Sequence, residues 1–200
     1  FSAGWKVSEE KFLRKVKFLN SLKLRAGWGS TGNNRVGAYA YQSLLQTNPG
    51  SGYVFGDNEL FNQGDIQQQL AIKNLKWETT NQANFGLDFS LLNRRISGTA
   101  DYYHKKTKDL LLFAELIPSV GFLWNTQNVG AISNNGFEFT VDTKNIKTDN
   151  FSWSSNINIS TNKNKVLSLG NQDAIKTDAQ IGWDGERHYI TEVGQPVGMM

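Results

Sequence analysis

The chain has 200 residues, no cysteine, a formal net charge of +3 and a hydrophobic share of 38%, which excludes disulfide scaffolds, thiol catalysis and zinc sites with cysteine ligands. Its 12% aromatic residues, 19 glycines and only 3 prolines favour β structure over disorder. Lysines and arginines are interspersed with acidic residues, so we expect no nucleic-acid partner. The chain contains no run of about 18 apolar residues, so no transmembrane helix is predicted.

The first fifth of the chain predicts two strands with a helix between them. Residues 1–5 resemble part of a strand, and the chain starts there at Phe1 rather than at a methionine, so we expect an excerpt of a longer protein. In residues 8–20, Phe12, Val16 and Leu19 stand at helical spacing among lysines and arginines, which predicts a short amphipathic helix. Such a helix fits a solvated linker or a membrane surface. Residues 18–29 then alternate as a strand.

Four further strands are predicted from strict alternation of apolar and polar residues. They cover 83–91, 95–104, 136–144 and 151–161. The connections at 92–95 and 144–150 are short, whereas 30–82, 105–135 and 162–200 are expected as long loops. Alternate connections of an up-and-down antiparallel sheet lie at the same end. The sequence therefore predicts an all-β, antiparallel up-and-down sheet with long loops at one end and tight turns at the other.

The apolar face of these strands has two possible environments. In a soluble sandwich or small barrel it would line a core. In an outer-membrane barrel it would face lipid, and the polar face would line a wet lumen. Strands of about 9–11 residues, the uneven loops and aromatic residues at strand ends favour the membrane. Since a barrel in lipid must close, five strands and a fragment indicate missing neighbours on both sides.

Several segments resemble the C-terminal half of the SusC/RagA-type TonB-dependent outer-membrane transporters. They are LKLRAGWGSTGNN (22–34), the block from NLKWETT to YYHKKTKDLLL (74–112), NVGAISNNGFEFTV (128–141), FSWSSNINISTNKNKV (151–166) and EVGQPVG (192–198). The block at 74–112 is the most specific. The likeness covers nearly the whole chain in order and spacing.

This resemblance implies a 22-stranded barrel with an N-terminal plug, which residues 1–200 lack. It also implies import of oligosaccharides or peptides across the outer membrane of a Gram-negative bacterium, driven through the TonB complex. A SusD-like surface lipoprotein would be the partner at the outer mouth. A soluble or secreted β-sheet binding module is the alternative, followed by an outer-membrane adhesin or enzyme.

Two sets of candidate residues follow from the barrel interpretation. The first should contact the lipid bilayer: Leu22, Leu24, Phe85, Leu87, Phe89, Ile96, Phe137, Phe139, Val141, Ile157 and Ile159. Phe151 and Trp153 near a short turn, and Trp28, Tyr102 and Tyr103 near the long loops, fit interfacial girdles. The second set holds expected loop aromatics that either stack on substrate or anchor the loops: Tyr53, Phe55, Trp124 and Trp183.

Other motifs do not predict chemistry. Residues 27–32 match G-x-G-x-x-G, but no helical period follows, so the sequence indicates no nucleotide or other cofactor. Oxygen-bearing clusters at 57–59 and at Asp173 with Asp178 lack EF-hand spacing, so no metal site is predicted. Asp101 and His104 fall on opposite faces of an ideal strand. We therefore expect no catalytic residues and no enzyme.

Overall fold

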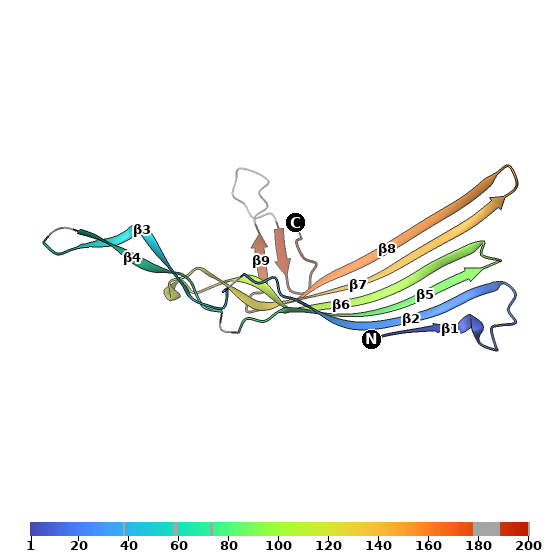
Figure 1. Ribbon diagram of the computed structural model, residues 1–200, viewed down its shortest axis with the longest axis horizontal. Helices are drawn as coiled ribbons and strands as arrows, with labels where there is room; N and C mark the ends of the chain where they lie inside the picture. Colours follow the sequence, from blue (N-terminus) through green and yellow to red (C-terminus); the bar gives the residue numbers. More distant parts are fainter. Residues whose placement is uncertain (38, 58–59, 73, 178–188, 200) are drawn as a thin grey trace.

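Six strands form one antiparallel sheet, with neighbours in the order β1–β2–β5–β6–β7–β8. The computed structural model describes residues 1–37, 39–57, 60–72, 74–177 and 189–199. Within them the sheet consists of β1 (Ser2–Lys6), β2 (Leu19–Asn33), β5 (Glu78–Leu91), β6 (Ile96–Glu115), β7 (Trp124–Lys147) and β8 (Ser152–Leu169). These strands lie side by side and leave β1 and β8 as the edges of an open sheet (Figure 1). The predicted up-and-down antiparallel arrangement is confirmed.

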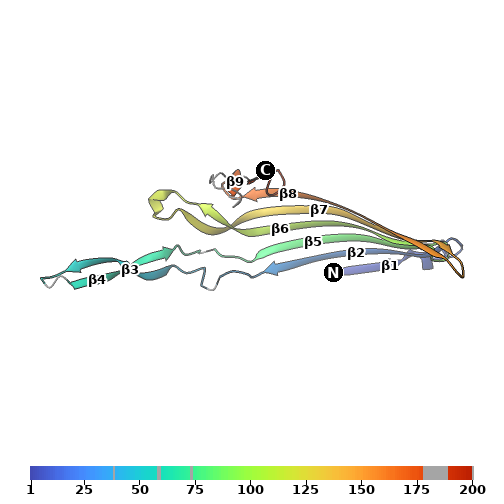
Figure 2. The same ribbon diagram turned by 90° about the horizontal axis from the view of Figure 1, so that it is seen from above.

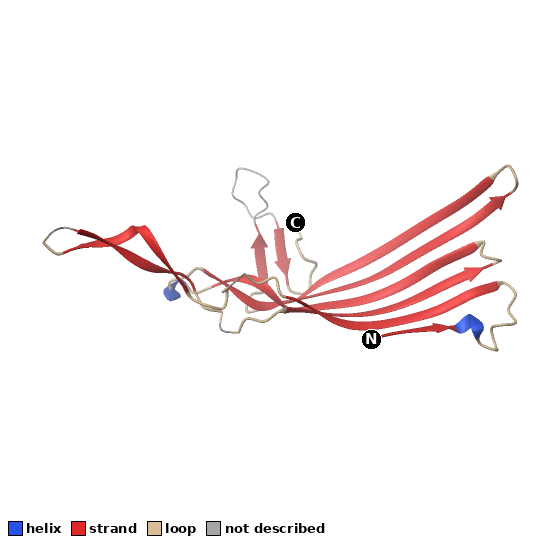
Figure 3. Ribbon diagram, viewed as in Figure 1, coloured by secondary structure: helices blue, strands red, loops and turns tan. Residues whose placement is uncertain are grey.

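Two small hairpins extend beyond this sheet. β3 (Leu44–Phe55) pairs with β4 (Leu60–Gln69), and this ribbon projects far from the main sheet (Figures 1 and 2). β9 (Ala174–Thr177) pairs with β10 (Tyr189–Glu192). The only helices in the described residues are two 3-10 turns, Val7–Glu9 and Pro118–Val120, so Figure 3 is almost entirely strand. None of the described helices is long and apolar enough to cross a membrane.

The connection between β5 and β6 is tight because three successive residues adopt a left-handed backbone. Leu92, Asn93 and Arg94 have φ angles of 52°, 56° and 62°. The Asn20 side chain accepts a hydrogen bond from the Arg94 N–H at 3.1 Å. The guanidinium of Arg95 donates to the carbonyl of Asn145 at 2.6 Å and so ties this turn to the last residues of β7. The β5–β6 connection is therefore held to the neighbouring strand at this end of the sheet.

The strands run further than the alternation predicted. Residues 105–115 and 124–135, expected as loop, continue β6 and β7 as a paired ribbon. Alternation is lost there because the register shifts between Thr107 and Leu110 and again before Leu111, which disturbs the two-residue period. Likewise, 30–82 contains β3 and β4, and β8 extends to Leu169. A backbone ladder needs no apolar face, so loss of alternation did not mark the strand ends.

The prediction of a helix in residues 8–20 is wrong. The 3-10 turn Val7–Glu9 is followed by isolated turns, closed by bonds such as Leu13 N–H to the Glu10 carbonyl at 3.0 Å. Phe12 and Phe18 stay exposed. Helices in proteins are stabilised mainly by packing their apolar stripe, and here the described chain offers no surface for that stripe.

The sheet is a single layer without a dry interior. Among the described residues, only Val7, Val166 and Leu169 are buried hydrophobic side chains. Phe85 is 57% exposed and Ile157 and Ile159 are each 54% exposed, although all three lie in the middle of long strands. No second layer of the described chain covers the apolar face, so the sandwich interpretation has no support here.

Gly98 on β6 is required by close approach. A Cβ at this position would lie 2.3 Å from the Thr140 carbonyl oxygen and 2.7 Å from the Phe89 ring. We predict that Gly98→Val lowers the free energy of unfolding of the intact protein by about 2 kcal/mol, because the backbone of β7 must shift to admit it. Ala100→Val, on the same strand and face, is the control. Urea unfolding measures both, and equal midpoints for the two variants would contradict the packing argument.

Candidate functional site

The register brings apolar side chains from all six strands onto one face of the sheet. Here a row means the residues directly opposite one another across neighbouring strands, which point to the same side. One row contains Trp5, Leu24, Leu87, Ala100, Phe139 and Ile159. The adjacent rows on this face contain Ala26, Phe85, Tyr102 and Phe137 on one side, and Leu22, Phe89, Gly98, Val141 and Ile157 on the other. We call this surface the apolar face.

Aromatic rings on the apolar face stack both between strands and along β7. Phe89 and Phe139 lie 6.5 Å apart between ring centroids, and Phe137 and Phe139 lie 6.4 Å apart, both nearly parallel. Because Gly98 has no side chain, the Phe89 ring lies across it toward β7. Beside these rings is a hollow of about 500 Å³, lined by Trp5, Leu24, Phe85 and other residues, several of them alanines. The face is apolar, uneven and open to its surroundings.

The edge of the apolar face runs obliquely across the strands. Toward the long connections, the unbroken series of apolar residues on this face ends at Trp28 in β2, whereas in β8 it ends at Ile159, two rows lower and before Thr161 and Lys163. Two rows are four residues, or roughly 13 Å, and the four strand spacings between β2 and β8 are roughly 19 Å. A level edge thus requires strands tilted by about 35°, close to the tilt of about 35–45° in outer-membrane barrels.

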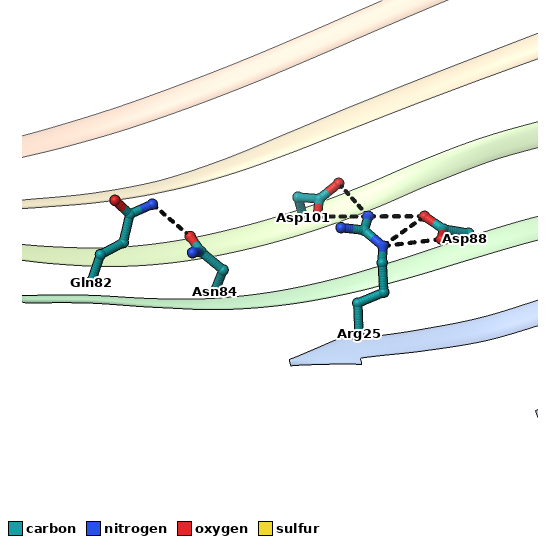
Figure 4. A network of polar contacts seen from close by, with 5 residues as sticks. All are labelled: Arg25, Gln82, Asn84, Asp88 and Asp101. Atoms are coloured by element: carbon teal, nitrogen blue, oxygen red, sulfur yellow. Dashed lines mark hydrogen bonds and ion pairs between the residues drawn. The ribbon is translucent and has the colours of Figure 1, made fainter. Parts of the chain in front are cut away.

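The opposite face is charged and hydrated, and its centre is an ion-pair network across three strands. Arg25 on β2 approaches Asp88 on β5 at 2.8 Å and Asp101 on β6 at 2.9 Å (Figure 4). Its Nε donates to both oxygens of Asp88 at 3.0 Å, and its Nη2 donates to both oxygens of Asp101. These three side chains are about one third exposed. We call the surface of the sheet that carries this network the polar face.

Gly86 lies directly under this network. A Cβ there would approach Asp101 Oδ1 at 2.5 Å and the Arg25 guanidinium carbon at 2.6 Å. The glycine therefore leaves the room in which one arginine reaches acids on two neighbouring strands. Farther along the polar face, the Tyr103 hydroxyl donates to Asn162 at 3.2 Å, and Asn164 donates to Asn134 at 2.8 Å. Polar side chains are thus paired with each other across strands.

Comparisons with known proteins identify the family to which this two-faced sheet belongs. Residues 1–187 match the family described as TonB dependent receptor-like, beta-barrel. The chain belongs to this family. It is 39% identical to the TonB-dependent receptor P26 of Formosa agariphila over 198 residues, and 41% identical to the TonB-dependent receptor SusC of Bacteroides thetaiotaomicron over 175 residues.

Solved structures show the same fold. The RagAB peptide transporter superposes with a TM-score of 0.79 at 23% identity, covering 98% of this chain. The RagAB peptide importer in its open-open state gives a TM-score of 0.80. This TonB-dependent receptor segment spans 19% of P26, 17% of SusC and 20% of the RagAB chain. The sheet is therefore one part of a much larger barrel, as the sequence predicted.

The structure brings together the first set of predicted residues. Leu22, Leu24, Phe85, Leu87, Phe89, Ile96, Phe137, Phe139, Val141, Ile157 and Ile159 all lie on the apolar face of this receptor segment. Trp28 and Tyr102 lie on the same face toward the long connections, and Trp153 lies opposite Ile146 near a tight turn. Tyr103 does not join the girdle, because its odd position in β6 turns it to the polar face.

The structure does not bring the second set of predicted residues together at one site. Tyr53 and Phe55 lie in β3, and Trp124 begins β7, so these three stand on extended ribbons rather than in loops. Tyr53 and Trp124 are exposed. Trp183 lies outside the described residues. The sequence missed these ribbons because their strands are irregular, with a register shift between Asn48 and Gly52.

The remaining motifs have structural explanations. The glycine-rich residues 27–32 belong to β2, so no helix opens after them. Asp101 pairs with Arg25 on the polar face, whereas the His104 ring nitrogen shares a hydrogen bond with the Asn135 side chain on the other face. Within the described residues, no three acidic or histidine side chains are grouped to hold a metal ion. Asn58, Glu59, Asp178 and His188 lie outside the described part.

The Arg25 network was not predicted, although the charges were visible. The sequence predicted that consecutive strands are neighbours but not their register, so it did not show that Asp88 and Asp101 approach one arginine. We predict a coupling free energy of about 1 kcal/mol between Arg25 and Asp101, since the pair is charge-assisted but only partly buried. A double-mutant cycle with Arg25→Met and Asp101→Asn in the intact receptor measures it. Lys23→Met combined with Asp101→Asn is the control cycle, and similar coupling in both cycles would contradict a specific network.

Proposed function

We propose that this chain is the wall and outer ribbons of an outer-membrane importer for oligosaccharides or peptides. The observation that carries the proposal is the separation of chemistry by face. Apolar residues of six strands share one side, and the carboxylates Asp88, Asp101, Glu138 and Asp142 share the other. A barrel wall between lipid and a wet lumen needs this separation, and its oblique apolar edge fits tilted strands.

The exposed apolar face supports lipid rather than water as its surroundings. Burying apolar surface is worth about 25 cal/mol per Å², and large contiguous apolar patches are rare on soluble monomers. Here stacked phenylalanines and isoleucines more than half exposed form a continuous band. Hydrocarbon chains would cover this band in the bilayer, and the eleven predicted lipid-facing residues would be the contact.

The polar face is proposed to line the lumen. A lumen-facing ion pair such as Arg25 with Asp88 keeps access to water, so its charges need not be fully desolvated. The same face contains the side-chain amides of Asn134, Asn162 and Asn164 and the Tyr103 hydroxyl. Such groups hydrogen-bond to water, to a plug or to a hydrophilic cargo. No reaction chemistry is required of them, so transport without catalysis is the proposed activity.

The relatives support the proposed partners and cargo. RagAB is named a peptide transporter, and SusC is named a TonB-dependent receptor. By the same resemblance, the parent protein would receive energy from the TonB complex and pair with a SusD-like surface lipoprotein. The β3–β4 ribbon and the far ends of β6 and β7 project beyond the sheet and are the described parts best placed to meet a lid or cargo (Figure 2).

The membrane orientation predicts unequal effects of one charge on the two faces. Leu87 lies at the middle of the apolar residues of β5, between Ala83 and Leu91. We expect Leu87→Arg to lower the free energy of unfolding by about 2–4 kcal/mol, as for arginine at the bilayer midplane. Thr99→Arg, on the polar face of β6, should change it by less than about 1 kcal/mol. Folding into vesicles under urea titration measures both, and equal losses would refute alternating lipid and water environments.

Uptake by cells tests the transport function itself. Deleting the parent gene should abolish growth on one class of nutrient, either an oligosaccharide or a peptide, supplied as the limiting source. The wild-type gene should restore growth, and a Leu87→Arg copy should not. Unchanged growth of the deletion strain on every candidate of both classes would argue against nutrient import while leaving the barrel architecture intact.

A further inference from the structure

Positive charges gather on the apolar face just beyond its aromatic edge. Following β6 past Tyr102, the next residues on this side are His104 and Lys106. Following β8 past Ile159 and Thr161, they are Lys163 and Lys165. We call these four residues the basic band. Three of them are exposed and Lys106 is half-buried.

The register places the basic band in two adjacent rows. One row runs His104–Asn135–Lys163, and the next runs Lys106–Ser133–Lys165. In each row a small polar side chain of β7 stands between two basic residues. Because β6 and β8 are two strand spacings apart, the flanking Cα atoms lie about 10 Å from each other. Two lysine side chains across that gap can reach one phosphate group, with the β7 side chain as a further hydrogen-bonding group.

No acidic side chain of the described residues pairs with the lysines of the basic band. Asp88, Asp101 and Glu138 point to the polar face. Asp109 lies three residues beyond Lys106, where the β6–β7 register shifts, and forms no ion pair with a described residue. None of the three lysines forms an ion pair with any residue that the structure describes, while His104 is hydrogen-bonded to Asn135. The polar face, in contrast, pairs its central arginine with two acids. The band therefore offers unneutralised positive charge toward whatever surrounds the barrel.

The height of the basic band matches the lipid headgroups. Lys106 is four residues beyond Tyr102, and Lys163 is four residues beyond Ile159, so both stand equally far above the oblique apolar edge. Four residues span roughly 13 Å along a strand, or roughly 10 Å along the membrane normal after tilt. The headgroup layer begins directly beyond the hydrocarbon, and lysine side chains extend readily toward it.

We propose that the basic band binds the phosphate groups of lipids in the outer leaflet. The inference rests on the proposed function, because it requires the apolar face to meet lipid and the long connections to lie outside. The occupant is a membrane lipid with a phosphorylated headgroup: its acyl chains cover the adjoining apolar face while its phosphates meet Lys106, Lys163 and Lys165. The band thereby fixes the depth of the barrel in the membrane and orders a lipid against β6–β8, which lie side by side (Figure 2).

The test uses the full-length protein in detergent, titrated with lipid A, which carries two phosphates, or with the same lipid after dephosphorylation. Native mass spectrometry gives the apparent affinity. Wild-type protein should prefer the phosphorylated lipid. The double variant Lys163→Gln/Lys165→Gln should lose that preference, with affinity falling at least about tenfold. The control Lys23→Gln/Lys105→Gln removes the same charge from the polar face and should bind as wild type does.

Three results would overturn the inference. They are equal binding of both lipids by wild type, affinity of Lys163→Gln/Lys165→Gln within twofold of wild type, and displacement of lipid A by equimolar inorganic phosphate. Should the glutamine variant misfold, Lys163→Arg/Lys165→Arg is decisive, since retained positive charge must retain binding. Insertion into phosphatidylcholine vesicles is measured separately: failure to insert would refute the membrane orientation, whereas insertion without phosphate preference would refute only the lipid site.

Discussion

The backbone hydrogen-bond register of six antiparallel strands is the constraint on which everything else depends. Because side chains opposite one another in a sheet point the same way, a fixed register turns six separate alternations into two continuous surfaces. A slip by one residue on β5 or β7 would place a phenylalanine among the carboxylates of the polar face and an aspartate among the rings of the apolar face. The bond from Arg95 to the end of β7 and the cross-strand pairs centred on Arg25 both act against such a slip.

A single-layer sheet of this kind is stable only in a particular setting. It has almost no buried core of its own in the described residues, and its two edge strands leave backbone groups unpaired. In hydrocarbon those groups must be paired by further strands. Closure of a barrel and insertion into lipid would together supply the stabilisation that a soluble domain obtains from its buried core. Stability, orientation and the proposed transport role thus have one physical origin, the contrast between the two faces.

That contrast also changes along the strands. Over the apolar band the two faces differ in polarity. In the few residues directly beyond Tyr102 and Ile159, both faces are polar and differ in charge pattern instead. The polar face pairs its central Arg25 with two acids, whereas the lysines of the basic band form no ion pair with a described residue. The transition occurs two rows lower on β8 than on β2, as expected if tilted strands cross a level interface. The proposed contacts with lipid, headgroups and lumen would therefore all follow from one register.

The sequence by itself determined which residues share a face in each strand, because a two-residue period is a local property of the chain; Leu87 and Asp88 could be assigned to opposite sides without any partner. The resemblance at 74–112 further indicated the family. Only the tertiary structure decided what lies opposite what: Arg25 between two acids, Phe89 over Gly98, and Lys106 across from Lys165. The strand ends and the β3–β4 ribbon also had to come from the structure, since backbone pairing continues where side-chain alternation has stopped. Long-range pairing depends on register, which is a property of two paired strands and cannot be deduced from the sequence of either one.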